Sequence, residues 1–178
     1  LLMSFSFLGY VHIEPISITT AYIPVLLAGA LAGPFESTVV GAVFGLASMW
    51  KASAYYVTAF DQLFSSVMSG SPVQSILLSV GSRALFGLLV GLLYLAFRNA
   101  RHPAPWIALV SFFGPTIHSA LVYSALWLFF PETGYTPASA LKSLVTVKGL
   151  LSDLLAADVV LLVWRLLRSR AWTQFVRR

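Results

Sequence analysis

The 178-residue chain contains no cysteine, and charged residues are scarce in it. The lack of cysteine excludes disulfide bonds and thiolate chemistry. Only 10% of the residues are charged, whereas an ordinary soluble domain carries about 25%. The chain is 58% hydrophobic, and its apolar runs are continuous rather than alternating. This pattern indicates membrane helices and argues against a β-barrel.

The apolar runs predict an all-α integral membrane protein, a six-transmembrane-helix bundle that forms one domain over residues 1–178. The first predicted helix is short, and we expect it to be truncated at its start. The six predicted spans are Leu1–Val11, about Ile18–Gly33, about Ser37–Trp50, about Ile76–Phe97, Trp106–Phe130 and about Leu150–Leu167.

The basic residues predict the orientation of this bundle. Seven of the eleven are arginines in one short loop and the C-terminal tail, two segments separated by two predicted spans: Arg98, Arg101, Arg165, Arg168, Arg170, Arg177 and Arg178. The positive-inside rule places both segments, and therefore both termini, in the cytoplasm. A nucleic-acid interface would need a solvated basic face, and there is little soluble chain to carry one.

Small residues recur at a spacing of four along three predicted spans. Such pairs allow helix backbones to approach closely in lipid, either inside one bundle or against another subunit. We predict these roles for Ala28, Ala32, Gly41, Gly45, Gly87 and Gly91.

Motifs for enzymatic chemistry are missing from the sequence. There is no GxxxxGK[ST] phosphate loop, no HExxH and no carboxylate–histidine cluster at metal spacing. Ser82 lies in "GSRALFG", which lacks the second half of a GxSxG nucleophile elbow. We therefore expect no catalytic residues, no metal and no cofactor.

Three polar residues interrupt the apolar spans at a similar predicted depth. At about 1.5 Å per helical residue, Arg83 and Asp153 lie about 22 Å above the cytoplasmic end, and His118 lies about 18 Å above it. The bilayer core is about 30 Å thick, so all three fall in its outer half. This coincidence predicts the floor of a pocket that opens to the outside.

An aromatic segment of the outward-facing Lys51–Ser75 loop is expected to lie above this floor. Aromatic side chains beside a few fixed polar groups are typical of small-molecule pockets. The predicted binding residues are Trp50, Lys51, Tyr55, Tyr56, Arg83, His118 and Asp153. Structural roles stay open: an Arg83–Asp153 pair that joins helices, His118 as a packing residue, and the aromatics as an interfacial belt.

Two stretches resemble the substrate-binding S components of energy-coupling factor (ECF) vitamin transporters. The stretch Ile18–Met49 is similar to the family's sequence of a span, a Gly-Pro turn and a glycine-rich span. The stretch Ser75–Asn99 resembles its "SVLPRxLxGLxxGLxY" pattern, with Gly81 and Ser82 where the family often has Leu-Pro. The resemblance implies a six-helix vitamin-binding subunit of a prokaryotic plasma membrane.

The same resemblance implies partners and a ligand. S components have no ATPase of their own and dock on a transmembrane coupling (T) subunit that two cytoplasmic ATPases drive. Pantothenate-type members tend to carry an "NT" pair in the fifth span, where this chain has "TIHS" at Thr116–Ser119. That departure removes an amide that a pantothenate site would use. An imidazole and several aromatics suit a larger ligand, so cobalamin is the first candidate, and pantothenate and riboflavin stay open. The alternative is a structural membrane protein without a ligand, such as a rod-shape scaffold subunit.

Overall fold

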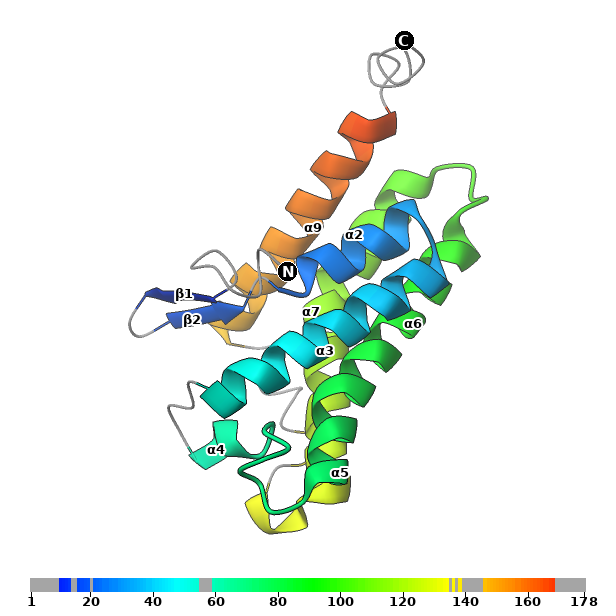
Figure 1. Cartoon of the computed structure of the whole chain (residues 1–178). Coiled ribbons are helices and arrows are strands. Elements are labelled where there is room, and N and C mark those ends of the chain that lie inside the picture. Colours follow the sequence, from blue (N-terminus) through cyan, green and yellow to red (C-terminus); the bar gives the residue numbers. More distant parts are fainter. Residues whose placement is uncertain are drawn as a thin grey trace.

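The computed structural model describes residues 10–13, 16–19, 21–54, 59–134, 136, 138 and 146–168. The described part is a helical bundle with one two-stranded hairpin at its side (Figure 1). Its elements are β1 (Tyr10–Ile13), β2 (Ile16–Thr19), α2 (Ile23–Leu31), α3 (Pro34–Ala54), α4 (Ala59–Gln62), α5 (Pro72–Ile76), a π-helical segment (Leu77–Gly81), α6 (Ser82–Phe97), α7 (Pro103–Phe129), a 3₁₀ turn (Pro131–Thr133) and α9 (Val147–Arg168).

Proline lies in the first turn of four of these α-helices. Pro34 opens α3, and Pro24, Pro72 and Pro103 occupy the first turns of α2, α5 and α7. The first helical turn leaves backbone N–H groups unpaired, so a residue without an N–H is tolerated there. Between α2 and α3, Gly33 adopts φ +136, a conformation that favours glycine, and this allows the two helices to follow one another closely.

The hairpin corrects the predicted start of the bundle. Strands β1 and β2 pair antiparallel, with Tyr10 opposite Thr19 and Ile13 opposite Ile16. The predicted helical spans were therefore wrong at Tyr10 and Val11 and at Ile18 and Thr19. β-Branched residues dominate "ISIT", and they favour extended backbone over helix. Residues 1–9 of the predicted first span lie outside the described residues.

The predicted second span is a much shorter helix. Helix α2 has 9 residues, which is about 14 Å and less than half of the bilayer core.

The prediction of a helical protein is confirmed. Within the described residues two helical runs, Pro72–Phe97 and Pro103–Phe129, are long and apolar enough to cross a membrane. Helices α3 and α9 have 21 and 22 residues but are less apolar. The count of six spans and the position of the termini stay predictions.

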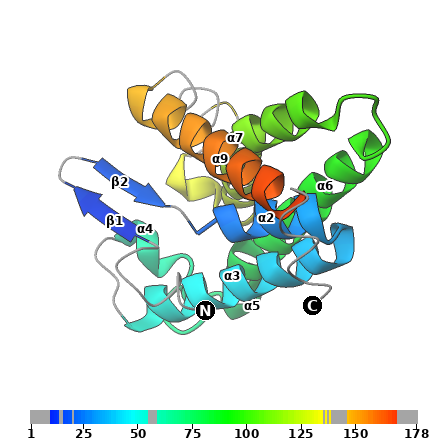
Figure 2. The same cartoon turned by 90° about the horizontal axis from the view of Figure 1, so that it is seen from above.

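Helix α2 occupies the centre of the bundle. Figures 1 and 2 place it between α9 and the α3–α6 pair. Its Leu26 is fully buried, as are Phe86 and Val90 of α6 and Val160 of α9. These side chains belong to the main apolar core. The short helix α2 thus packs against both α6 and α9 and holds them in one core.

Glycines form the closest contact in the bundle, the antiparallel seam between α3 and α6. A Cβ atom at Gly41 or Gly45 of α3 would lie closer than 3.0 Å to the backbone of Arg83 or Val80. A Cβ atom at Gly87 or Gly91 of α6 would meet the backbone at Ser37 or Pro34 in the same way. The four glycines thus serve internal packing, as one of the two predicted roles requires, and are covered by the facing helix.

The alanine pair predicted for packing lies elsewhere. Ala28 is half-buried in α2, and Ala32 is exposed just after its end. Neither residue belongs to the α3–α6 seam.

We predict that Gly87→Ala destabilises the protein by roughly 1–3 kcal/mol, because the new methyl group would overlap the Ser37 carbonyl. Its unfolding midpoint in detergent measures this. Gly81→Ala is the matched control on the same helical run, because its Cβ would meet only the Leu77 side chain, at 3.7 Å. Equal midpoints for the two variants would contradict the assigned seam.

Candidate functional site

Arg83 lies in the first turn of α6 and is only 6% exposed. Its Nη1 donates a hydrogen bond of 2.9 Å to the Ser79 carbonyl oxygen. Its guanidinium carbon lies 5.0 Å from the ring centroid of Phe44 and 5.3 Å from that of Phe64. Aromatic ring faces attract a cation, so α3 and the segment after α4 both help to hold this buried charge.

The π-helical segment before α6 positions the acceptor for Arg83. Ser79 belongs to this segment, and its hydroxyl donates to the Phe64 carbonyl oxygen at 2.8 Å. Ser82 donates to the Leu78 carbonyl oxygen. Such π-helical turns are rare and often occur at functional sites. Here the irregular backbone lies directly against Gly45 of α3.

His118 of α7 contacts the same aromatic group. Its ring stacks on Phe44 at a centroid distance of 5.7 Å and meets Phe86 edge-on at 5.3 Å. The Nε2 atom is buried, and within the described residues it has no hydrogen-bond partner. Pro115 lies inside the same helix, so the N–H that a regular helix would supply one turn before His118 is missing.

Asp153 of α9 is 1% exposed. Its Oδ2 accepts a hydrogen bond of 3.4 Å from the Thr116 hydroxyl of α7, and the neighbouring Ser152 hydrogen-bonds to Tyr22. Thr116 therefore contacts α9, and His118, two residues further on, contacts α3 and α6. Arg83 is linked to α7 through Phe44 and His118, and Asp153 through Thr116. Their common depth in a membrane stays a prediction.

Arg83 and Asp153, which were hypothesised to pair, contact different groups. Asp153 is bonded to Thr116, while Arg83 is bonded to Ser79 and lies against phenylalanine rings. The two charges therefore belong to neighbouring groups that α7 separates.

The outer residues of the predicted pocket are placed only in part. Trp50 is 61% exposed near the end of α3, and Lys51 beside it is half-buried. Tyr55 and Tyr56 lie outside the described residues. The exposed Trp50 agrees better with an interfacial position than with a pocket wall.

Three phenylalanines that were not predicted as site residues pack against Arg83 or His118: Phe44, Phe64 and Phe86. Phe44 lies between the two seam glycines of α3, and Phe86 follows Arg83 by one turn of α6. Residues three or four apart lie on one face of a helix. The sequence therefore already placed Phe44 on the face of Gly41 and Phe86 on the face of Arg83. Phe64 carried no such signal, since it comes from an irregular segment.

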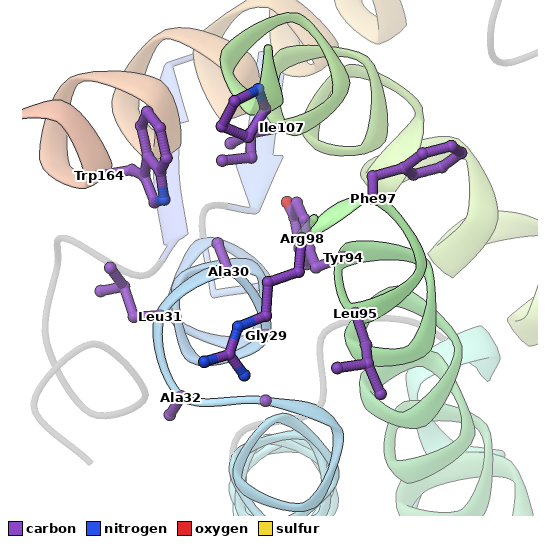
Figure 3. Close-up of a pocket in the computed structure, with 12 residues that line it drawn as sticks. Gly29, Ala30, Leu31, Ala32, Tyr94, Leu95, Phe97, Arg98, Ile107 and Trp164 are labelled. Atoms are coloured by element: carbon purple, nitrogen blue, oxygen red, sulfur yellow. The ribbon is translucent and has the colours of Figure 1, made fainter. Parts of the chain in front are cut away.

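A cavity of ≈ 80 Å³ lies at the other end of the bundle, among the ends of α2, α6, α7 and α9 (Figure 3). Pockets for drug-sized ligands have roughly 300–1,000 Å³, so this cavity admits a small group rather than a vitamin. Its lining residues are Gly29, Ala30, Leu31, Ala32, Gly33, Tyr94, Leu95, Phe97, Arg98, Pro103, Ile107 and Trp164.

Within the described part of the chain, no group of three or more histidine, aspartate or glutamate side chains is arranged to hold a metal ion. No protein-family model matches the chain, and no curated protein matches its sequence. Function is therefore inferred from the residues themselves.

We predict that Thr116→Val destabilises the protein by about 1–3 kcal/mol, because the buried Asp153 would lose its hydrogen-bond donor. Thermal unfolding in detergent measures the effect. Thr38→Val is the control, since the Thr38 hydroxyl donates to the Pro34 carbonyl one turn back in its own helix and bonds to no other helix among the described residues. It should change stability by less than about 0.5 kcal/mol. A Thr116 variant as stable as the Thr38 variant would show that the contact with α9 contributes nothing.

Proposed function

We propose that the chain is a membrane subunit that binds a water-soluble vitamin and delivers it to an ECF-type import complex. The observation that carries the proposal is the buried group of Arg83 and His118 around Phe44. An arginine inside an apolar span is costly and usually marks a binding or transport role. The resemblance of Ile18–Met49 and Ser75–Asn99 to S components supports the same role.

The distribution of charge supports the proposed orientation. Arg98 and Arg101 follow α6, and Arg165 and Arg168 lie in the last turns of α9; both segments are at the same end of the bundle (Figure 1). By the positive-inside rule this end is cytoplasmic in a prokaryotic plasma membrane. The Arg83 group then lies toward the outer face, where a vitamin arrives.

The packing around Arg83 bears on how a ligand would bind. The rings of Phe44 and Phe64 cover the guanidinium, so a ligand that reaches it must displace at least one ring. Cobalamin is the first candidate from the sequence, with pantothenate and riboflavin next. Cobalamin is the largest of the three vitamins, so its binding would require a larger rearrangement of α3 and of the segment after α4 than the binding of pantothenate or riboflavin.

The proposed subunit performs no chemistry itself. ATP hydrolysis belongs to two cytoplasmic ATPases, and a transmembrane T subunit couples them to this chain. The seam glycines are covered by their facing helices, so the T subunit would dock on other residues.

A ligand-free structural protein, such as a rod-shape scaffold subunit, is the second candidate. The internal contacts of Arg83 with Ser79, Phe44 and Phe64 favour it, because they join three segments of the bundle. In that case Arg83→Ala would mainly impair folding and assembly.

We predict that His118→Phe folds normally but binds vitamin at least about tenfold more weakly. A phenyl ring keeps the packing against Phe44 and Phe86 but lacks ring nitrogens, and the loss of one polar contact is worth about 1–2 kcal/mol. Thermal shift of the wild type with cobalamin, pantothenate and riboflavin selects the vitamin, and titration of both proteins with it measures the affinities.

His102→Phe is the matched control, because His102 is exposed before α7 at the opposite end of the bundle. It should bind like the wild type. A tight ligand at ~1,000 times its Kd stabilises the wild type by about 4 kcal/mol. If none of the three vitamins stabilises it while Arg83→Ala fails to assemble, the structural candidate is the better one.

A further inference from the structure

The cavity at the basic end of the bundle is separate from the Arg83 group. It lies where α2, α6 and α9 end and α7 begins (Figure 3). The α6–α7 connection and the last turns of α9 bring arginines to this end. The cavity therefore lies in a positive electrostatic environment that the vitamin-binding proposal does not use.

Arg98 is the charged residue that lines this cavity. Its side chain extends across the space toward Gly29 and Ala32 at the end of α2 (Figure 3). Within the described residues, the guanidinium has no hydrogen-bond or ion-pair partner. The negative end of the α2 dipole attracts it, but helix termini are only partial charges. A permanently charged group with five donors thus borders the cavity.

The apolar walls of the cavity fit an interfacial position. Leu31 and Leu95 are 45% and 47% exposed, so these walls continue onto the outer surface of the bundle. At the same end Phe97 and Trp106 stack with a centroid distance of 4.2 Å. Tryptophan is enriched at membrane–water interfaces, and basic pockets between helices on the cytoplasmic side bind phosphate-bearing lipid headgroups.

We propose that this cavity binds a phosphate group, with Arg98 as its charge partner. The volume of ≈ 80 Å³ suits a group of that size, and an acyl chain from the same molecule would lie along Leu31 and Leu95. Glu36, whose Oε2 lies 3.4 Å from the position of a Cβ at Gly33, opposes binding from the α3 side. An anionic phospholipid and a free phosphate share this chemistry, and the experiment below distinguishes them.

The test uses the full chain in detergent, incubated with phosphatidylglycerol or phosphatidylcholine and repurified, with the bound lipid counted per protein. The wild type should retain phosphatidylglycerol preferentially. Arg98→Gln should lower its affinity about fivefold, the factor that corresponds to roughly 1 kcal/mol per arginine at a membrane surface. Ala30→Leu, which places a larger side chain at the cavity wall, should lower it without a change of charge.

Arg101→Gln is the matched control, because Arg101 is exposed in the same connection and does not line the cavity. It should retain phosphatidylglycerol like the wild type. A separate arm measures thermal stabilisation by inorganic phosphate alone. Retained lipid that phosphate does not displace identifies the lipid as the source, and Arg98-dependent stabilisation by phosphate identifies the free ion. Equal losses in Arg98→Gln and Arg101→Gln, or binding of neither probe, would overturn the proposal.

Discussion

The direct backbone contact between α3 and α6 is the constraint on which the rest of the bundle depends. Gly41 and Gly45 on one helix and Gly87 and Gly91 on the other leave no room for side chains between them. In lipid, where apolar association gives little driving force, such close packing is a main source of helix affinity. Because Phe44 lies between the two glycines of α3, the same contact brings its ring over Arg83.

The polar group around Arg83 follows from that packing. A buried guanidinium loses its hydration, and the Ser79 carbonyl and two ring faces compensate for it in part. Helix α7 connects this polar group to α9, since its His118 contacts Phe44 and its Thr116 bonds to Asp153 of α9. Entry of a ligand then requires movement of rings that now stabilise the closed arrangement. The proposed transport role and the stability of the bundle are therefore in direct competition.

The two ends of the bundle differ in the charge that they present. Arg83 is enclosed by aromatic rings, whereas Arg98 lies exposed beside a small cavity. An enclosed charge selects a ligand through desolvation and fixed geometry, but an exposed one acts mainly through long-range attraction. This difference is why the two proposed sites are expected to take different molecules and respond to different substitutions.

The sequence predicted the long helices α3, α6, α7 and α9, because apolar runs are a local signal. It also predicted one polar level, because helix rise converts residue counts into depth. It failed at the hairpin, where a few β-branched residues adjoin a longer apolar run. The contacts between these groups could not be predicted from the sequence. Phe44 and Asp153 contact residues of other helices, and such contacts depend on how whole helices pack.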